Sequence, residues 1–243
     1  MSQGQPRDAR SVEMPSLCRT CEARDRGICG ALSAAHLEEL SRHTTRRVVP
    51  LGSEIFAEEQ EQEVVANLLS GVVKLSKLMS DGRQQIVGLQ FAPDFVGRPF
   101  ERTAQVTAEA ATTVRVCSFP RSVLERLAER APEMEHRLHS QALRELDEAR
   151  DWLMTLGRRT AAERVATFLL LIAEHIDLDA EAPAAEFDLP LKRADIADFL
   201  GLTIETVSRQ ITRLRRAEVI AVQQNRHVTV LDLDALREAA GSD

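Results

Sequence analysis

The sequence predicts an α+β protein that begins with an antiparallel β sandwich or barrel, continues with a long helix and ends in a winged helix-turn-helix. Three observations predict this order. β-Branched runs interrupted by glycines fill about residues 46–119, helical spacing follows from Arg121, and two short amphipathic helices flank Gly201. At 243 residues and 44% hydrophobic content, the chain is long enough to bury a core.

The N-terminal stretch, residues 1–17, is polar, contains Pro6 and Pro15, and is predicted to lack fixed structure. It has no apolar core of the kind found in signal peptides, and the chain has no apolar run of about eighteen residues that would span a membrane. These features predict a cytoplasmic protein with no membrane partner.

Three of the four cysteines lie in the motif CRTCEARDRGIC, as Cys18, Cys21 and Cys29, and the fourth is Cys117. Two structural disulfides are disfavoured in a reducing cytoplasm. An iron–sulfur cluster, a structural zinc and a thiol redox switch between Cys18 and Cys21 remain open from the residues alone. Cys117 is equally compatible with a buried apolar side chain on a strand.

The β-like region has several short strands, and Asp81-Gly82 between two β-branched runs predicts a hairpin. We expect an antiparallel sandwich or barrel, with Cys117 on or beside its last strand.

A long helical stretch is predicted from Arg121 to about Leu156, interrupted at Pro132. Its apolar residues repeat every seven positions over two heptads. The predicted seam consists of Ala142, Leu146, Ala149, Leu153 and Leu156. The pattern is compatible with a dimer seam and with packing inside the chain. A domain boundary is expected near Gly157, followed by a second helix, AAERVATFLLLIAEHI, and an acidic loop.

The C-terminal segment has the spacing of a helix-turn-helix. Gly201 permits the turn between two helices whose apolar residues fall on one face of each. These residues are Ile196, Ala197 and Leu200 in the first helix and Val207, Ile211 and Leu214 in the second. The following VIAVQQNRHVTVL predicts a hairpin that turns at Gln224-Asn225 and forms a wing.

The second helix carries side chains that suit DNA bases. Glu205, Ser208 and Arg209 stand at i, i+3 and i+4, so they project together from the N-terminal half of the helix that would enter a major groove. Arginine pairs with guanine, glutamate accepts from cytosine, and serine bonds either way. The predicted phosphate contacts are Arg213, Arg215, Arg216 and Arg226. The alternative is a helical hairpin with a solvated charged face.

Charge is distributed in agreement with this prediction. The net charge is −7, yet residues 191–229 hold seven Lys/Arg against four Asp/Glu, a local charge of +3. No glycine-rich phosphate loop, zinc-protease motif or nucleophile elbow occurs, and the six histidines form no compact ligand set, so an enzyme is not predicted.

Over essentially its whole length, this order of elements resembles the CRP/FNR superfamily of bacterial transcription regulators. The fragment ETVSRQITRLRR, with its Glu-x-x-Ser-Arg core, is similar to the recognition helix of the fumarate-and-nitrate-reduction (FNR) branch. The four cysteines resemble those of that branch's oxygen sensors, especially FnrL-type regulators, whose longer last gap in the loop is present here.

The resemblance implies the domain organisation. A sensor domain with a cyclic-nucleotide-binding-like β-roll would cover residues 18–120, a dimerisation helix 121–157, and a winged helix-turn-helix DNA-binding domain 158–243. It also implies that Cys18, Cys21, Cys29 and Cys117 ligate a [4Fe-4S] cluster that oxygen dismantles.

The resemblance further implies partners. They are a second copy of the chain, inverted-repeat double-stranded DNA with TTGAT-like half-sites, and RNA polymerase. A cyclic nucleotide is not expected, because the glutamate that members binding it carry after the glycine of DFVGRPFERTAQ is replaced by Arg98, followed by Pro99.

Overall fold

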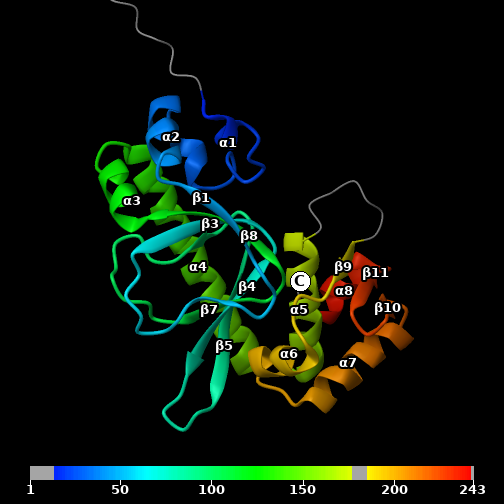
Figure 1. The fold of residues 1–243 in the computed structure, drawn as a ribbon. Helices are drawn as coiled ribbons and strands as arrows, with labels where there is room; N and C mark the ends of the chain where they lie inside the picture. The colour runs from blue at the N-terminus through cyan, green and yellow to red at the C-terminus, as the bar shows by residue number, and fades with distance from the viewer. Residues whose placement is uncertain (1–13, 177–184, 242–243) are drawn as a thin grey trace, which may run out of the picture.

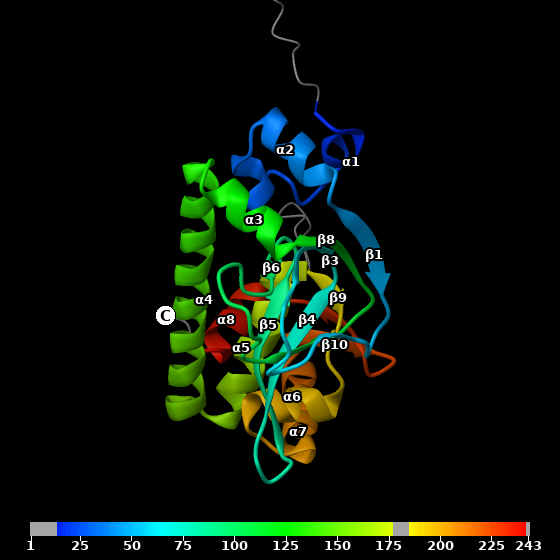
Figure 2. The same cartoon turned by 60° about the vertical axis from the view of Figure 1, so that its left-hand side comes forward.

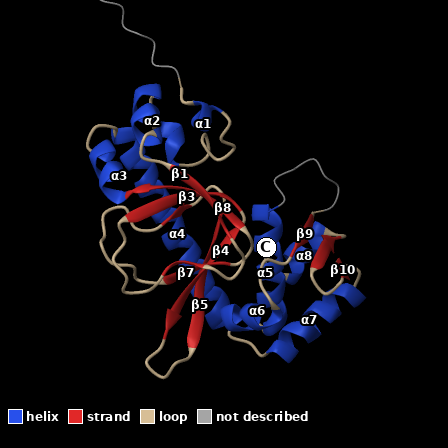
Figure 3. Ribbon diagram, in the orientation of Figure 1, coloured by secondary structure: helices blue, strands red, loops and turns tan. Residues whose placement is uncertain are grey.

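The computed structural model describes residues 14–176 and 185–241. An N-terminal β-roll and a C-terminal winged helix-turn-helix lie side by side, and the long helix α4 runs along one side of the β-roll (Figures 1 and 2). The predicted α+β fold class is confirmed, with strands gathered in two regions and helices between and around them (Figure 3).

The β-roll consists of two four-stranded antiparallel sheets, ordered β1-β8-β3-β6 and β2-β7-β4-β5. Their inward-facing aliphatic residues form a separate hydrophobic cluster between the sheets. The strands are β1 (Thr45–Val49), β2 (Glu54–Phe56), β3 (Val64–Ser70), β4 (Val72–Leu78), β5 (Gln84–Phe91), β6 (Phe95–Val96), β7 (Thr107–Ala110) and β8 (Val114–Pro120). The predicted Asp81-Gly82 hairpin joins β4 to β5, with Gly82 at φ 85°. Cys117 lies on the last strand, as predicted.

A small helical cap covers one end of the β-roll. It contains α1 (Ser16–Arg19), the 3-10 helix η1 (Ile28–Ala31) and α2 (Ala34–Ser41). Ile28, Leu37 and Leu40 are buried against α3 (Arg121–Ala128) and the first turns of α4 (Pro132–Arg158). The prediction that residues 1–17 lack structure lies outside the described residues for 1–13, and α1 begins at Ser16.

The predicted break in the long helical stretch is confirmed at Pro132, the first residue of α4. Proline is favoured there because a first-turn N–H has no partner within the helix. α4 passes through Gly157 and ends at Arg158, and α5 (Ala161–Ile176) follows.

The C-terminal region has the predicted winged helix-turn-helix. Its elements are β9 (Glu186–Asp188), α6 (Arg193–Leu200), α7 (Ile204–Arg216), β10 (Ile220–Gln223), β11 (His227–Val230) and α8 (Leu233–Ala239). Gly201 ends α6 in the left-handed conformation, φ 60°, which glycine adopts without steric cost. Gln224 and Asn225 turn the wing at φ 49° and 58°.

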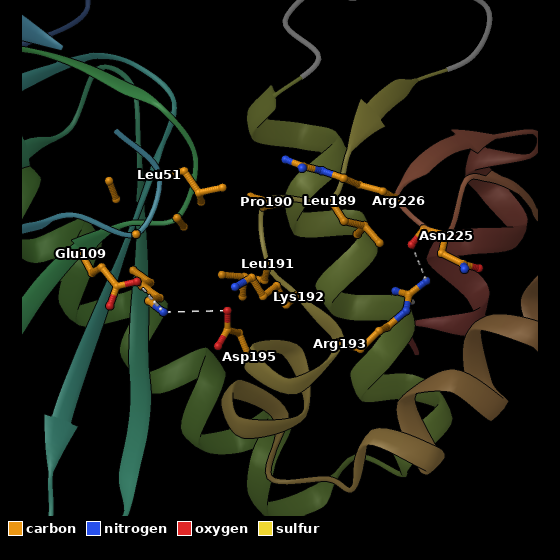
Figure 4. A pocket seen from close by; sticks show the side chains of 14 residues that line it. Leu51, Glu109, Leu189, Pro190, Leu191, Lys192, Arg193, Asp195, Asn225 and Arg226 are labelled. Carbon is orange, nitrogen blue, oxygen red and sulfur yellow. Dashed lines mark hydrogen bonds and ion pairs between the residues drawn. The ribbon is translucent and has the colours of Figure 1, made fainter. Parts of the chain in front are cut away.

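The β-roll contacts the DNA-binding region through the β4–β5 hairpin. Asp198 on α6 accepts a hydrogen bond at Oδ2 from the Ile86 backbone N–H, at 2.7 Å, and its own carbonyl accepts one from Gln85 Nε2, at 2.6 Å. Nearby, Lys74 Nζ lies 2.9 Å from Glu109 and 3.8 Å from Asp195 at a pocket between the two regions (Figure 4). These contacts fix the orientation of α6, and therefore of α7, relative to the β-roll.

Candidate functional site

The turn between α6 and α7 positions the surface predicted to meet DNA. Thr203 caps α7 by accepting a hydrogen bond from the Thr206 N–H at 3.2 Å. The back of α7 is buried in the core through Val207, Ile211 and Leu214. The opposite face of α7 is therefore turned toward solvent.

Glu205, Ser208 and Arg209 all lie on this exposed face. Arg209 Nη2 donates to the Thr206 hydroxyl at 3.2 Å. Hydrogen bonds from its own backbone N–H and from Thr203, together with the charge of Arg209, lower the pKa of Glu205. Glu205 thus presents an acceptor carboxylate beside a donor guanidinium, the pair that the prediction assigns to a cytosine and a guanine.

The four arginines predicted to contact phosphates are exposed and lie on α7 and the wing. Arg213, Arg215 and Arg216 occupy the last turn of α7, and Arg226 follows the wing turn. Arg226 Nε lies 3.9 Å from Asp188, so one carboxylate partly offsets its charge.

Arg193, at the first position of α6, was missed by sequence reasoning. Its Nη2 donates to the Asn225 carbonyl at 3.2 Å and so ties α6 to the wing (Figure 4). Its Nη1 is buried without a partner among the described residues, and burial lowers the pKa of Arg193. The contact joins positions far apart in the sequence, so no local pattern could have revealed it.

The four cysteines line one pocket at the junction of the helical cap and the β-roll. Cys18 comes from α1, Cys21 from the following turn, Cys29 from η1 and Cys117 from β8. The other residues of this cysteine pocket are Leu17, Ala23, Arg24, Leu40, Thr44, Arg46, Asn67 and Leu69. Cys117 faces Arg46 on β1 and Asn67 on β3 in the strand register, which brings those two polar residues beside the thiols.

Burial dominates the electrostatics of the cysteine pocket. It raises the pKa of Cys29 to about 12 and that of Cys117 to about 11, and the neighbouring cysteines add to the rise. Burial also raises the pKa of Cys18, while Arg46 opposes the rise at both Cys18 and Cys117. Without a bound cation, these three thiols are neutral at physiological pH.

The donor set fits a four-thiolate centre in its chemistry. Asn67, 5% exposed, donates from Nδ2 to Cys29 Sγ at 3.3 Å, and its Oδ1 has no partner in the described part of the chain. Hydrogen bonds to cysteine sulfur tune iron–sulfur and zinc sites alike. In residues 14–176 and 185–241, no three His, Cys, Asp or Glu side chains are arranged to hold a metal ion, so the thiols share a pocket without forming a closed coordination sphere.

The predicted seam of α4 is mostly exposed. Ala142, Leu146, Ala149 and Leu153 face solvent, with Leu146 45% and Leu153 70% exposed, and Leu156 is half-buried. Leu143 and Met154, which the heptad pattern omitted, extend this apolar strip at 58% and 53% exposure. The side of α4 that packs within the chain carries Met134, Leu138, Gln141 and Thr155 instead.

Known proteins match this chain in both regions. Residues 46–131 match the cyclic nucleotide-binding domain family, and residues 163–239 match the Crp-like helix-turn-helix domain family. A probable transcriptional activator of Rhizobium leguminosarum bv. viciae is 56% identical, over 91% of this chain and 92% of its own length. The transcriptional activator protein FnrL of Cereibacter sphaeroides is 38% identical, over 95% of this chain and 96% of its own length.

The chain belongs to the CRP/FNR family of transcription regulators. The solved structure of FixK2 from Bradyrhizobium japonicum agrees, with a TM-score of 0.74 and 32% identity over 81% of this chain and 96% of FixK2. The expected family and the prediction that the chain is not an enzyme are confirmed.

Membership of the CRP/FNR family relates two exposed surfaces of the chain, one on the helix-turn-helix and one on α4. Regulators of this family bind DNA and dimerise, and this chain presents an exposed helix-turn-helix face and an exposed apolar strip on α4. None of the described helices is long and apolar enough to cross a membrane.

Proposed function

We propose that this CRP/FNR regulator senses oxygen through a [4Fe-4S] cluster held by Cys18, Cys21, Cys29 and Cys117. The observation that carries the proposal is the convergence of the only four cysteines of the chain on one pocket, although Cys117 is distant from the others in sequence. Similarity to FnrL over nearly the whole chain supports it. Acting on DNA, the regulator would work in the cytoplasm.

The residues around the thiols suit an anionic centre. When bound, a [4Fe-4S] cluster supplies an oxygen-labile link among four thiolates. Arg46 and Arg24 line the same pocket and bring positive charge to it, and Asn67 donates to the sulfur of Cys29. Ligation would draw Cys18, Cys21 and Cys29 closer to Cys117, because the thiols do not form a closed coordination sphere in the described part of the chain.

The downstream half of the proposal is dimerisation through the α4 strip. Two chains paired along Ala142, Leu146, Ala149, Leu153 and Leu156 would place two copies of α7 about one DNA turn apart. Two-fold symmetry then requires an inverted repeat, with TTGAT-like half-sites in which Arg209 meets a guanine and Glu205 a cytosine. Arg213, Arg215, Arg216 and Arg226 would hold phosphates, and the bound dimer would contact RNA polymerase as an activator.

The loop between β6 and β7 argues against a cyclic nucleotide as the effector of this regulator. The loop between β6 and β7 carries Arg98 and Pro99 after Gly97, and the Arg98 N–H donates to Gln62 Oε1 at 3.2 Å. A cation stands where relatives that bind cyclic nucleotides carry a carboxylate.

An anaerobic visible spectrum with iron and sulfide analysis, repeated on the same sample after air, tests the proposed cluster. About four irons and four sulfides per chain, with colour that bleaches in air, are expected. A protein that stays colourless after anaerobic reconstitution with iron and sulfide would refute the cluster. Bound zinc would then favour a structural zinc site, and a Cys18–Cys21 disulfide formed when the same sample is exposed to air would favour a thiol redox switch.

DNA binding is tested on the same samples by mobility shift at fixed salt, with an inverted-repeat duplex and a scrambled duplex of equal length. Binding to the inverted repeat is expected only for the anaerobic, iron-loaded protein. Equal binding before and after air would refute oxygen control while leaving the DNA-binding assignment intact.

A further inference from the structure

The loop that carries Cys29 packs directly on the N-terminal turns of α4. Ile28, the residue before Cys29, is 2% exposed and belongs to the same hydrophobic cluster as Met134 and Leu138 of α4. Closely packed side chains transmit displacement because interiors have few voids to absorb it. A displacement of Cys29 would therefore shift the side chains of α4 that pack against Ile28.

Arg137 adds a polar tie between the same two elements. From α4, its Nη1 donates to the backbone carbonyls of Asp25, at 2.9 Å, and Gly27, at 2.6 Å. Both carbonyls lie between Cys21 and Cys29, and Arg137 itself is half-buried. One charged nitrogen thus fixes two points of the cysteine loop to the helix.

Gly30 shows how closely the guanidinium approaches the loop. A Cβ at Gly30 would lie 2.7 Å from Arg137 Nη1 and 2.6 Å from the Asp25 carbonyl oxygen. A side chain at this position would push against the tie, so glycine allows the guanidinium to reach its acceptors.

The position of Arg137 on α4 links the tie to the apolar strip. Ala142, the first strip residue, follows five positions later in the same uninterrupted helix. At 1.5 Å per residue, the two are separated by about 7.5 Å along the helix axis. A change in the loop therefore reaches the strip through little more than one turn of helix.

We propose that Arg137 is the positioning residue that couples the cysteine loop to the dimerisation strip of α4. This inference rests on the proposed function, because it assumes that ligation rearranges the loop. Arg24 and Arg46 line the cysteine pocket itself, whereas Arg137 holds the outer side of the loop to the helix. Removing the tie should leave ligation intact and weaken its effect on α4.

The test compares Arg137→Gln and Arg137→Lys with wild type, with Arg126→Gln as the matched control. Arg126 is an exposed arginine on α3 whose side chain donates to the Ser122 carbonyl of its own helix. For each protein, iron per chain, the dimer dissociation constant with and without iron, and hydrogen exchange of residues 23–30 and 132–146 are measured anaerobically.

In Arg137→Gln, iron content should match wild type, and the ratio of iron-free to iron-loaded dimer dissociation constants should fall by about tenfold. Loading should alter hydrogen exchange in the loop but no longer in α4. Arg137→Lys keeps the positive charge but not the guanidinium group, so its ratio of dissociation constants should lie between those of wild type and Arg137→Gln. Arg126→Gln should have the wild-type ratio.

Two results would overturn the coupling role. An unchanged ratio in Arg137→Gln would show that α4 responds without the tie, and lost iron binding would assign Arg137 to shaping the ligand loop instead. If wild type binds no iron, the proposed function fails separately. The tie is then judged on the iron-free proteins, where unchanged exchange of α4 in Arg137→Gln would refute it.

Discussion

Helix α7 draws its three proposed base-contacting residues from five consecutive positions, whereas the cysteine pocket draws its four thiols from α1, a turn, η1 and β8. The environments differ as well. On α7 exposure and local hydrogen bonds lower the pKa of Glu205, while in the pocket burial raises the pKa of Cys29 to about 12.

The difference teaches where this regulator can be switched. The proposed base-contacting residues of α7 lie within one capped helix, so their arrangement relative to one another does not depend on the cysteine pocket. The cysteine pocket, in contrast, is lined by residues of both the helical cap and the β-roll, so its geometry depends on how these two parts pack. Under the proposed mechanism, a signal that changes this packing would alter the geometry of a dimer without altering the proposed base-contacting residues.

The largest expected effect is from Cys117→Ala, which removes the one thiol contributed by the β-roll. One iron would lack a protein ligand, so the cluster should be lost, and anaerobic DNA binding with it. Iron analysis and mobility shift check this, with Ser118→Ala, the buried neighbour on β8, as control. A Cys117→Ala protein that still dimerises and binds DNA would contradict the proposed switch.

Arg209→Ala should break the recognition surface alone. Each bidentate contact to guanine contributes about 1–3 kcal/mol of base discrimination, and a dimer makes two, so affinity for the inverted repeat should fall about 30-fold or more. Scrambled DNA should bind nearly as before. Arg215→Ala should instead weaken both duplexes alike and reduce the salt dependence by about one ion per chain. Equal losses for Arg209→Ala on both duplexes would make it a phosphate contact.

Leu153→Asp should disrupt the apolar strip of α4, through which we propose that a signal at the cysteine pocket reaches the α7 surface of a dimer. Losing a leucine from an interface costs about 1.5–3 kcal/mol, so the dimer dissociation constant should rise about tenfold or more. Because Leu153 is 70% exposed, the melting temperature of the monomer should hardly change. Analytical ultracentrifugation measures the effect, and Leu231→Asp, 53% exposed at the end of the wing, is the control. An unchanged dimer would place the seam elsewhere.

Asp94→Asn should give the smallest effect. Burial raises the pKa of Asp94, against the opposing charges of His175 and Arg144, while Asp94 Oδ2 accepts from the Phe91 N–H at 2.9 Å. The folded chain therefore holds this proton more tightly than the unfolded chain, and the stabilisation is lost as pH rises from the unfolded value through the raised one.

Asparagine keeps the acceptor oxygen without the charge. At neutral pH the melting temperature of Asp94→Asn should exceed that of wild type by about 1–4 °C, and the difference should vanish near pH 3. Thermal melts at a series of pH values measure this. A variant less stable at neutral pH would show that His175 and Arg144 outweigh burial.

Much of the fold could be predicted because its signals are local. Asp81-Gly82, Pro132, Gly201 and Gln224-Asn225 each constrain the backbone at their own position, and the structure has a hairpin, a helix start, a helix end and a wing turn there. The heptad pattern found most of the α4 strip but omitted Leu143 and Met154, because a seven-residue period describes a narrow seam and an exposed face is wider.

The sequence by itself determined the order of elements, the helix-turn-helix and the residues that α7 exposes, because helix periodicity and turn chemistry act over a few residues. Only the tertiary structure decided that Cys117 shares a pocket with the N-terminal cysteines, that Asp198 receives the β4–β5 hairpin, that Arg193 meets the wing, and that Arg137 ties the cysteine loop to α4. Each of these contacts joins segments distant in sequence, and their meeting depends on strand register and core packing, which no local spacing encodes.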